Sequence, residues 1–87
     1  NEFVDFAGRI VWAAVKGADG ISLLNPDGTV RMQEVFNFGK YKDRSVAEVL
    51  RLDPGYYSWI LSSDFTLNTK QVLTRIRLRE YNNQNRR

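Results

Sequence analysis

Residues 35–61, VFNFGKYKDRSVAEVLRLDPGYYSWIL, decide the fold because the hydrophobic pattern changes from strand-like to helical within them. Gly39 ends a stretch rich in phenylalanine. Ser45, with Glu48 three residues later, is a capping-box pattern and predicts the start of a helix. Asp53 followed by Pro54 predicts another start, because aspartate caps helices well and proline suits the first helical position. We therefore expect short helices at about residues 46–52 and 54–62.

A third helix is expected at about residues 68–81. Val72, Leu73 and Ile76 would form its buried stripe, since residues three and four apart share one helix face. Asn68 and Gln71 form a second pair of the capping-box kind. Residues 82–87 are polar, and we predict that they are a disordered tail.

The segment before Gly39 has the composition of strands. It is rich in β-branched and aromatic residues up to Val15. Further on, two sets of residues alternate: Val30, Met32, Glu34, Phe36 and Phe38 against Arg31, Gln33, Val35 and Asn37. The sequence of residues 25–28, NPDG, is a strong turn signal. These features predict a small antiparallel sheet of about three strands within residues 5–38. With the helices, they define an α+β fold.

The composition favours one domain, residues 1–87, which we expect to be an accessory unit of a larger protein because the chain begins with Asn1. Cysteine and histidine are absent, which excludes zinc sites of the Cys/His type and any catalytic histidine. The carboxylates are scattered, so no two-metal centre is predicted. The apolar runs are too short to span a bilayer. We expect a cytoplasmic protein, and in this chain no catalytic residue, metal ligand or cofactor.

The positive charge lies in the second half of the chain. Residues 1–38 carry three basic and five acidic side chains, whereas residues 39–87 carry ten basic and five acidic ones. This asymmetry is compatible with a polyanionic partner and equally with a solvated basic surface.

Two groups of residues are candidates for nucleic-acid binding. In the first, Lys40 and Lys42 could contact phosphates, and Tyr41 and Tyr57 could stack on bases. The alternative is a strand-to-helix corner that needs Gly39 for its geometry. The spacing of Trp59 with Tyr56 and Ile60 favours a core position for the tryptophan.

The second group lies on the third helix, where Arg75 and Arg79 are one turn apart on one flank and Lys70 lies on the other. Arginines near a helix C-terminus also complement the helix dipole, which is the simpler explanation for Arg79 but not for Lys70.

The ordered motifs VFNFGKYK at residues 35–42, VAEVL at 46–50, DPGYYSWIL at 53–61 and TKQVL at 69–73 resemble the exodeoxyribonuclease X-type C-terminal domain. That domain is attached to bacterial 3′→5′ exonucleases, including epsilon subunits of DNA polymerase III. The resemblance implies a parent enzyme with a separate catalytic domain that uses divalent metal ions. The family usually has glycine at the position of Asp43 and often lysine at that of Arg44.

Two functions follow as hypotheses. The first is a non-catalytic domain that helps hold substrate DNA, single-stranded or at a 3′ end, for the exonuclease in replication or repair. The second is a protein–protein tether that links the exonuclease to the polymerase or another replication partner.

Overall fold

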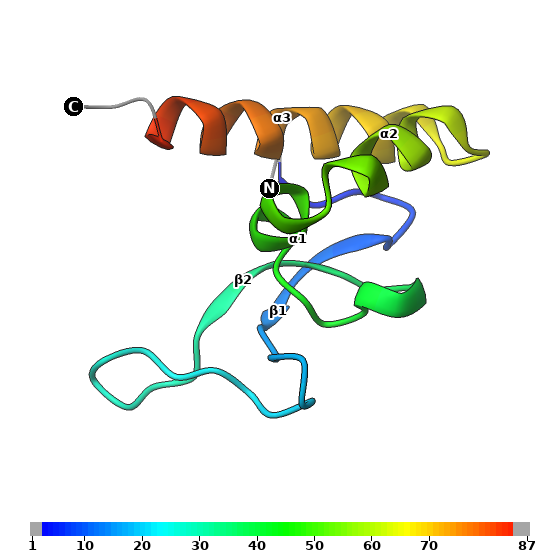
Figure 1. Ribbon diagram of the computed structural model, residues 1–87. Coiled ribbons are helices and arrows are strands. Elements are labelled where there is room, and N and C mark those ends of the chain that lie inside the picture. Colours follow the sequence, from blue (N-terminus) through cyan, green and yellow to red (C-terminus); the bar gives the residue numbers. More distant parts are fainter. Residues whose placement is uncertain (1–2, 85–87) are drawn as a thin grey trace.

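The computed structural model describes residues 3–84, and its secondary structure confirms the α+β class. Strands β1 (Ile10–Ala14) and β2 (Met32–Phe36) form an antiparallel sheet in which Ile10 pairs with Phe36 and Ala14 with Met32. The 3-10 helix η1 (Gly39–Tyr41) follows, then helices α1 (Val46–Leu52), α2 (Pro54–Ser62) and α3 (Leu67–Gln84). Figure 1 shows α3 as a long rod on the side of the molecule opposite the loops that follow β1.

The prediction of about three strands was wrong by one, because the middle segment is too short to form a ladder. Residues 16–30 form two successive loops, each closed by a single bridge, Lys16 with Ser22 and Leu24 with Val30. The loops meet in a ring of three backbone hydrogen bonds: Val15 N–H to Arg31 O at 3.0 Å, Arg31 N–H to Leu23 O at 3.0 Å, and Leu23 N–H to Val15 O at 2.9 Å. We call this ring the backbone triangle.

The core lies between the sheet and the three helices. Ile10 and Phe36 contribute from the strands, and the helices add Val46, Val49, Tyr56, Ile60, Val72, Leu73 and Ile76. The stripe predicted for α3 is therefore confirmed. Within residues 3–84 no helix has the length and apolar character needed to cross a membrane.

The helix starts agree with the capping rules. Ser45 Oγ accepts a hydrogen bond from Glu48 N–H at 3.3 Å, and Asp53 Oδ1 accepts one from Tyr56 N–H, also at 3.3 Å. The predicted Asn68 cap was wrong, since Thr66 Oγ1 accepts from Thr69 N–H at 3.2 Å and the Asn68 side chain instead accepts from Phe6 N–H at 2.7 Å. At the other end α3 includes residues 82–84, which were predicted to be disordered, while residues 85–87 lie outside the described part of the chain.

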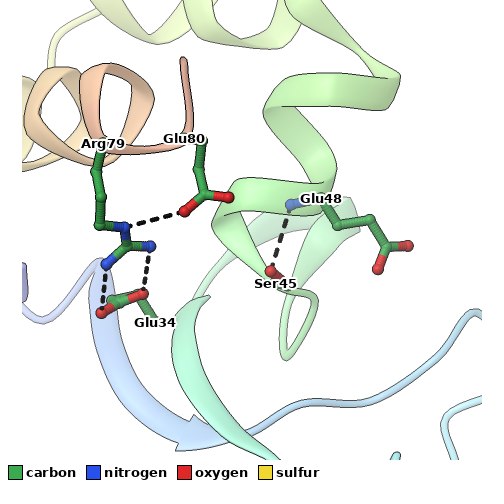
Figure 2. A network of polar contacts seen from close by, with 5 residues as sticks. All are labelled: Glu34, Ser45, Glu48, Arg79 and Glu80. Carbon is green, nitrogen blue, oxygen red and sulfur yellow. Dashed lines mark hydrogen bonds and ion pairs between the residues drawn. The ribbon is translucent and has the colours of Figure 1, made fainter. Parts of the chain in front are cut away.

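A bidentate ion pair joins β2 to α3 (Figure 2). The guanidinium of Arg79 donates to both carboxylate oxygens of Glu34, at 3.0 and 3.1 Å, and its Nε donates to Glu80 at 3.0 Å. The hydrogen bond to Glu34 raises the pKa of Arg79 further above its ordinary value. Glu34 is only 6% exposed, so the cost of burying its carboxylate is offset by this cation.

Replacing Arg79 with leucine should therefore destabilise the fold by about 2–3 kcal/mol, because it leaves the buried Glu34 carboxylate uncompensated. The double variant Glu34→Leu/Arg79→Leu should be closer to the wild type, since no charge is then buried alone. Urea denaturation of the three proteins measures the difference. A double variant less stable than Arg79→Leu would contradict this account.

Asp43 is the one non-glycine residue with positive φ among residues 3–84, at 67°. Its backbone N–H donates to Phe36 O and its carbonyl accepts from Lys16 N–H, both at 2.8 Å, so the turn is held from two sides. Its carboxylate lies 3.7 Å from Lys16 Nζ. Glycine would adopt this left-handed conformation without strain, and glycine is what the resemblance described above implies at this position.

We expect Asp43→Ala to destabilise the fold by about 1–2 kcal/mol, because a Cβ without a compensating polar group is unfavourable in this conformation. Asp43→Gly is the matched control, since it removes the same ion pair but relieves the strain, and it should be nearly neutral. Thermal denaturation compares the two, and equal losses would assign the effect to the ion pair instead.

Candidate functional site

An open groove of about 460 Å³ lies between η1 and the first turns of α2. We call it the aromatic groove, and its lining residues are Phe38, Gly39, Lys40, Asp53, Gly55, Tyr56 and Trp59. Its walls are predominantly apolar, with one cation and one carboxylate among the side chains. Such a combination suits a flat, largely apolar ligand group that carries charge at one edge.

Tyr56 is the ring around which the groove is organised. It is 8% exposed and packs edge-on against Phe36 at 5.4 Å and against Tyr41 at 4.8 Å between ring centroids. Trp59 stacks on it at 5.4 Å with an interplanar angle of 27°. Burial raises the pKa of the Tyr56 hydroxyl, and the nearby Asp53 adds to the shift.

The expectation that Trp59 belongs to the core was wrong. Its side chain is 52% exposed and forms part of the groove wall, with Phe65 edge-on to it at 5.7 Å. The residues of α2 that are buried are Tyr56 and Ile60. Trp59 shares their side of the helix but lies toward its edge, where its ring covers Tyr56 and leaves an indole surface open to solvent.

The carboxylate of Asp53 connects the elements around the groove. Oδ1 caps α2 through Tyr56 N–H, while Oδ2 accepts the Tyr41 hydroxyl at 2.7 Å and lies 4.0 Å from Lys40 Nζ. The hydrogen bond to Asp53 raises the pKa of Tyr41 above its ordinary value of about 10. The tyrosine therefore remains a neutral donor, and its contribution to stability is present below pH 10 and lost as the pH rises through the raised pKa.

Gly39 is required at the entrance to η1. Its φ of 66° lies in the left-handed region, and a Cβ built there would lie 3.3 Å from the Tyr56 hydroxyl oxygen. A side chain would therefore strain the backbone and crowd the ring on which the groove depends.

Two cations from different segments of the chain lie over aromatic rings in or next to the groove. Lys40 Nζ is 5.1 Å from the Tyr41 ring centroid and 5.8 Å from that of Tyr56. The Arg9 guanidinium carbon is 5.5 Å from the Phe38 centroid and 5.4 Å from that of Phe65. Sequence reasoning missed Arg9 and Phe65, because each is distant in the chain from the FGKYK motif and no local pattern places them beside it.

The predicted binding residues near η1 are only partly brought together. Lys40 lines the groove, whereas Tyr41 lies behind the lining residues, against Tyr56. The two side chains lie beside one another, not on opposite sides as an extended backbone would place them, because Gly39–Tyr41 is helical. Lys42 follows η1 and is exposed. Tyr57 faces α3, where its hydroxyl is 3.2 Å from Thr74 Oγ1 and its ring lies 4.9 Å from the Arg77 guanidinium carbon.

The cations predicted on α3 lie away from the groove. Lys70 and Arg75 line a second hollow, of about 470 Å³, together with Leu61, Leu67, Gln71 and Thr74. Arg79 is engaged by Glu34 and Glu80, so the expectation that Arg75 and Arg79 form one basic flank is not met. Like charges one helical turn apart repel each other, and here Glu34 and Glu80 offset the charge of Arg79.

Within residues 3–84 there is no group of three or more Asp, Glu, His or Cys side chains that could hold a metal ion. The groove lining offers aromatic faces and a lysine side chain as contacts for a ligand.

Residues 36–62 match the family model described as Exodeoxyribonuclease X-like C-terminal. All seven residues that line the aromatic groove lie inside this segment. The match supports an exodeoxyribonuclease X-like C-terminal domain, and so an exonuclease-associated protein. No curated protein and no solved structure matches the chain significantly.

Asp53→Ala should destabilise the domain by about 2 kcal/mol, because it removes a helix cap and the acceptor of the Tyr41 hydroxyl together. Ser45→Ala removes only a cap and should cost about 1 kcal/mol. In Asp53→Ala the absorbance titration of Tyr41 should also shift to lower pH. Equal stability losses and an unchanged titration would show that the Tyr41 contact contributes nothing.

Proposed function

We propose that this chain is a non-catalytic accessory domain of a bacterial DNA polymerase III epsilon-like 3′→5′ exonuclease, and that its aromatic groove holds single-stranded DNA. Cleavage would belong to a separate domain with divalent metal ions, acting in the cytoplasm in replication or repair. The observation that carries the proposal is the exposed Trp59 ring beside Lys40, within the segment that matches the exonuclease-associated family model.

The groove offers the two kinds of contact that unpaired nucleotides need. A base can stack on an exposed indole face whatever its sequence, and such stacking contributes about 1–3 kcal/mol per base. One face of the Trp59 ring stacks on Tyr56, so the ring is held in one orientation before a ligand binds. A paired base inside a duplex could not reach this face, which favours single strands over duplex DNA.

Phosphate contacts would come from the cations around the rings. Lys40 lies over the rings of Tyr41 and Tyr56. Arg9 lies over those of Phe38 and Phe65, and the exposed Lys42 follows η1. The carboxylate of Asp53 is the one acidic group in the groove lining, and it already accepts two hydrogen bonds from the chain. Its repulsion of a phosphate is therefore reduced.

A tether that binds another replication protein is the second candidate. It is favoured by Leu67 and Leu78, two strongly exposed apolar side chains on α3. In this alternative, α3 and not the aromatic groove would carry the interaction.

Trp59→Ala should weaken binding of a labelled oligothymidylate by about 5- to 150-fold, which is the loss of one stacked base. Trp12→Ala is the matched control, because Trp12 is 53% exposed but lies on β1 and outside the groove lining. Binding is measured by fluorescence anisotropy at several salt concentrations, with the protein dilute.

The log–log salt slope of the wild type should be about −2 if Arg9, Lys40 and Lys42 each neutralise one phosphate, at about −0.7 each. Lys40→Gln removes one of these phosphate contacts and should make the slope shallower by about 0.7. Absence of saturable binding at low salt, or equal losses for the two tryptophan variants, would refute the proposal. If oligonucleotides fail to bind while Leu78→Lys abolishes capture of a replication protein, the tether is the better account.

A further inference from the structure

Helix α3 carries a row of cationic and hydroxyl side chains on the flank that faces α1 and α2. Lys70, Thr74, Arg77 and Tyr81 follow one another at intervals of four, three and four residues, so they share one side of the helix. Arg51, in the last turn of α1, lies beside them, because it lines the same hollow as Arg77. We call these five residues the basic row.

Two hollows lie along the basic row. Lys70 and Thr74 line the hollow of about 470 Å³ described above. A further hollow, of about 240 Å³, is lined by Ala47, Leu50, Arg51, Arg77, Glu80 and Tyr81. Tyr57 contacts a residue of each hollow, since its hydroxyl is 3.2 Å from Thr74 Oγ1 and its ring centroid is 4.9 Å from the guanidinium carbon of Arg77. The two hollows therefore adjoin across a single tyrosine.

The cations of the basic row are not neutralised by the described part of the chain. Within residues 3–84 the ion pairs with carboxylates are formed by Lys16, Lys40, Arg44 and Arg79. Arg51, Lys70 and Arg77 form none within the same residues. Glu80 is the one carboxylate that lines either hollow, and it already accepts a hydrogen bond from Arg79 Nε at 3.0 Å. This flank is therefore suited to an anionic partner.

The arrangement of these cations fits phosphate groups. Arg77 is exposed and lies over the Tyr57 ring, and a guanidinium stacked in this way keeps the N–H donors at its edge for phosphate oxygens. Lys70 and Arg77 are seven residues apart, which is about 10.5 Å along the helix. The major groove of B-DNA is about 12 Å wide, so the row has the length needed to contact phosphates on both sides of that groove.

We propose that the basic row binds the phosphate backbone of duplex DNA, while the aromatic groove holds an unpaired end of the same molecule. The choice of DNA as the polyanion rests on the proposed function. Helix α2 separates the two surfaces, because Trp59 lines the groove and Tyr57 faces α3. A helix with its side chains is about 10–12 Å across, a distance that a short unpaired 3′ end can span. Contacts to the backbone carry no sequence information, so this binding is independent of base sequence.

Binding of a labelled blunt-ended duplex, measured by fluorescence anisotropy at several salt concentrations, tests the inference. If Arg51, Lys70 and Arg77 each neutralise one phosphate, the log–log salt slope should be about −2.7, at about −0.9 each. Arg51→Gln and Lys70→Gln should each make the slope shallower by about 0.9. Arg31→Gln is the matched control, because Arg31 is an exposed cation whose backbone bonds to the loops on the side opposite α3. Thermal denaturation checks that the variants are folded.

The choice of ligand separates the basic row from the groove. Trp59→Ala should weaken binding of a short oligothymidylate but not of the blunt duplex, whereas Arg51→Gln should do the reverse. If oligothymidylate fails to bind while duplex binding depends on Arg51, the groove is refuted and the basic row is supported.

The basic row is refuted, whatever the groove does, if the duplex shows no saturable binding at low salt or if Arg31→Gln causes the same loss as Arg51→Gln. Binding of polyglutamate that depends on Arg51, without binding of the duplex, would also overturn the proposal and would assign this flank to an acidic protein.

Discussion

A sheet of two strands is marginally stable by itself, so this fold depends on how firmly the helices are attached to it. The attachment has an apolar and an ionic part. Phe36 is fully buried among residues of all three helices, and its ring meets Tyr56 of α2 edge-on. Glu34, two residues earlier, receives both arms of the Arg79 guanidinium from α3. Apolar burial supplies most of the stabilisation, while the ion pair specifies which turn of α3 lies over β2.

The candidate site is built from the same residues that stabilise the fold. Tyr56 belongs at once to the core and to the groove, and the Asp53 carboxylate both starts α2 and orients Tyr41. Consequently the groove requires no rearrangement to present its rings, and the cost of ordering them is met when the domain folds. Variants at these positions would change stability and binding together. Trp59 is different, since it is half exposed and can be altered with less effect on the core.

The sequence predicted the parts of the structure that depend on local chemistry. The ends of α1 and α2 follow from Ser45, Asp53 and Pro54, and the buried stripe of α3 from its spacing. Features that depend on distant contacts were not predictable. The partner of Arg79 lies 45 positions away in the chain, and Arg9 reaches the rings from before β1. Trp59 was misplaced because helical spacing defines a side of the helix but not which of its large residues the neighbours cover. The predicted third strand is absent from the described residues because the two tight turns within residues 16–30 leave too few residues between them to form a ladder.

The backbone triangle has a consequence for how this domain could diversify. The two loops between Lys16 and Val30 are closed at their base by the three main-chain hydrogen bonds of the backbone triangle. The geometry of these bonds does not depend on side-chain identity. The pairing of Ile10–Ala14 with Met32–Phe36 lies outside these loops and does not involve their residues. Lengthening either of the two loops adds little to the entropic cost of closing that loop. Residues 16–30 are therefore a suitable insertion site for a foreign recognition peptide or a reporter, because the helices do not depend on these loops.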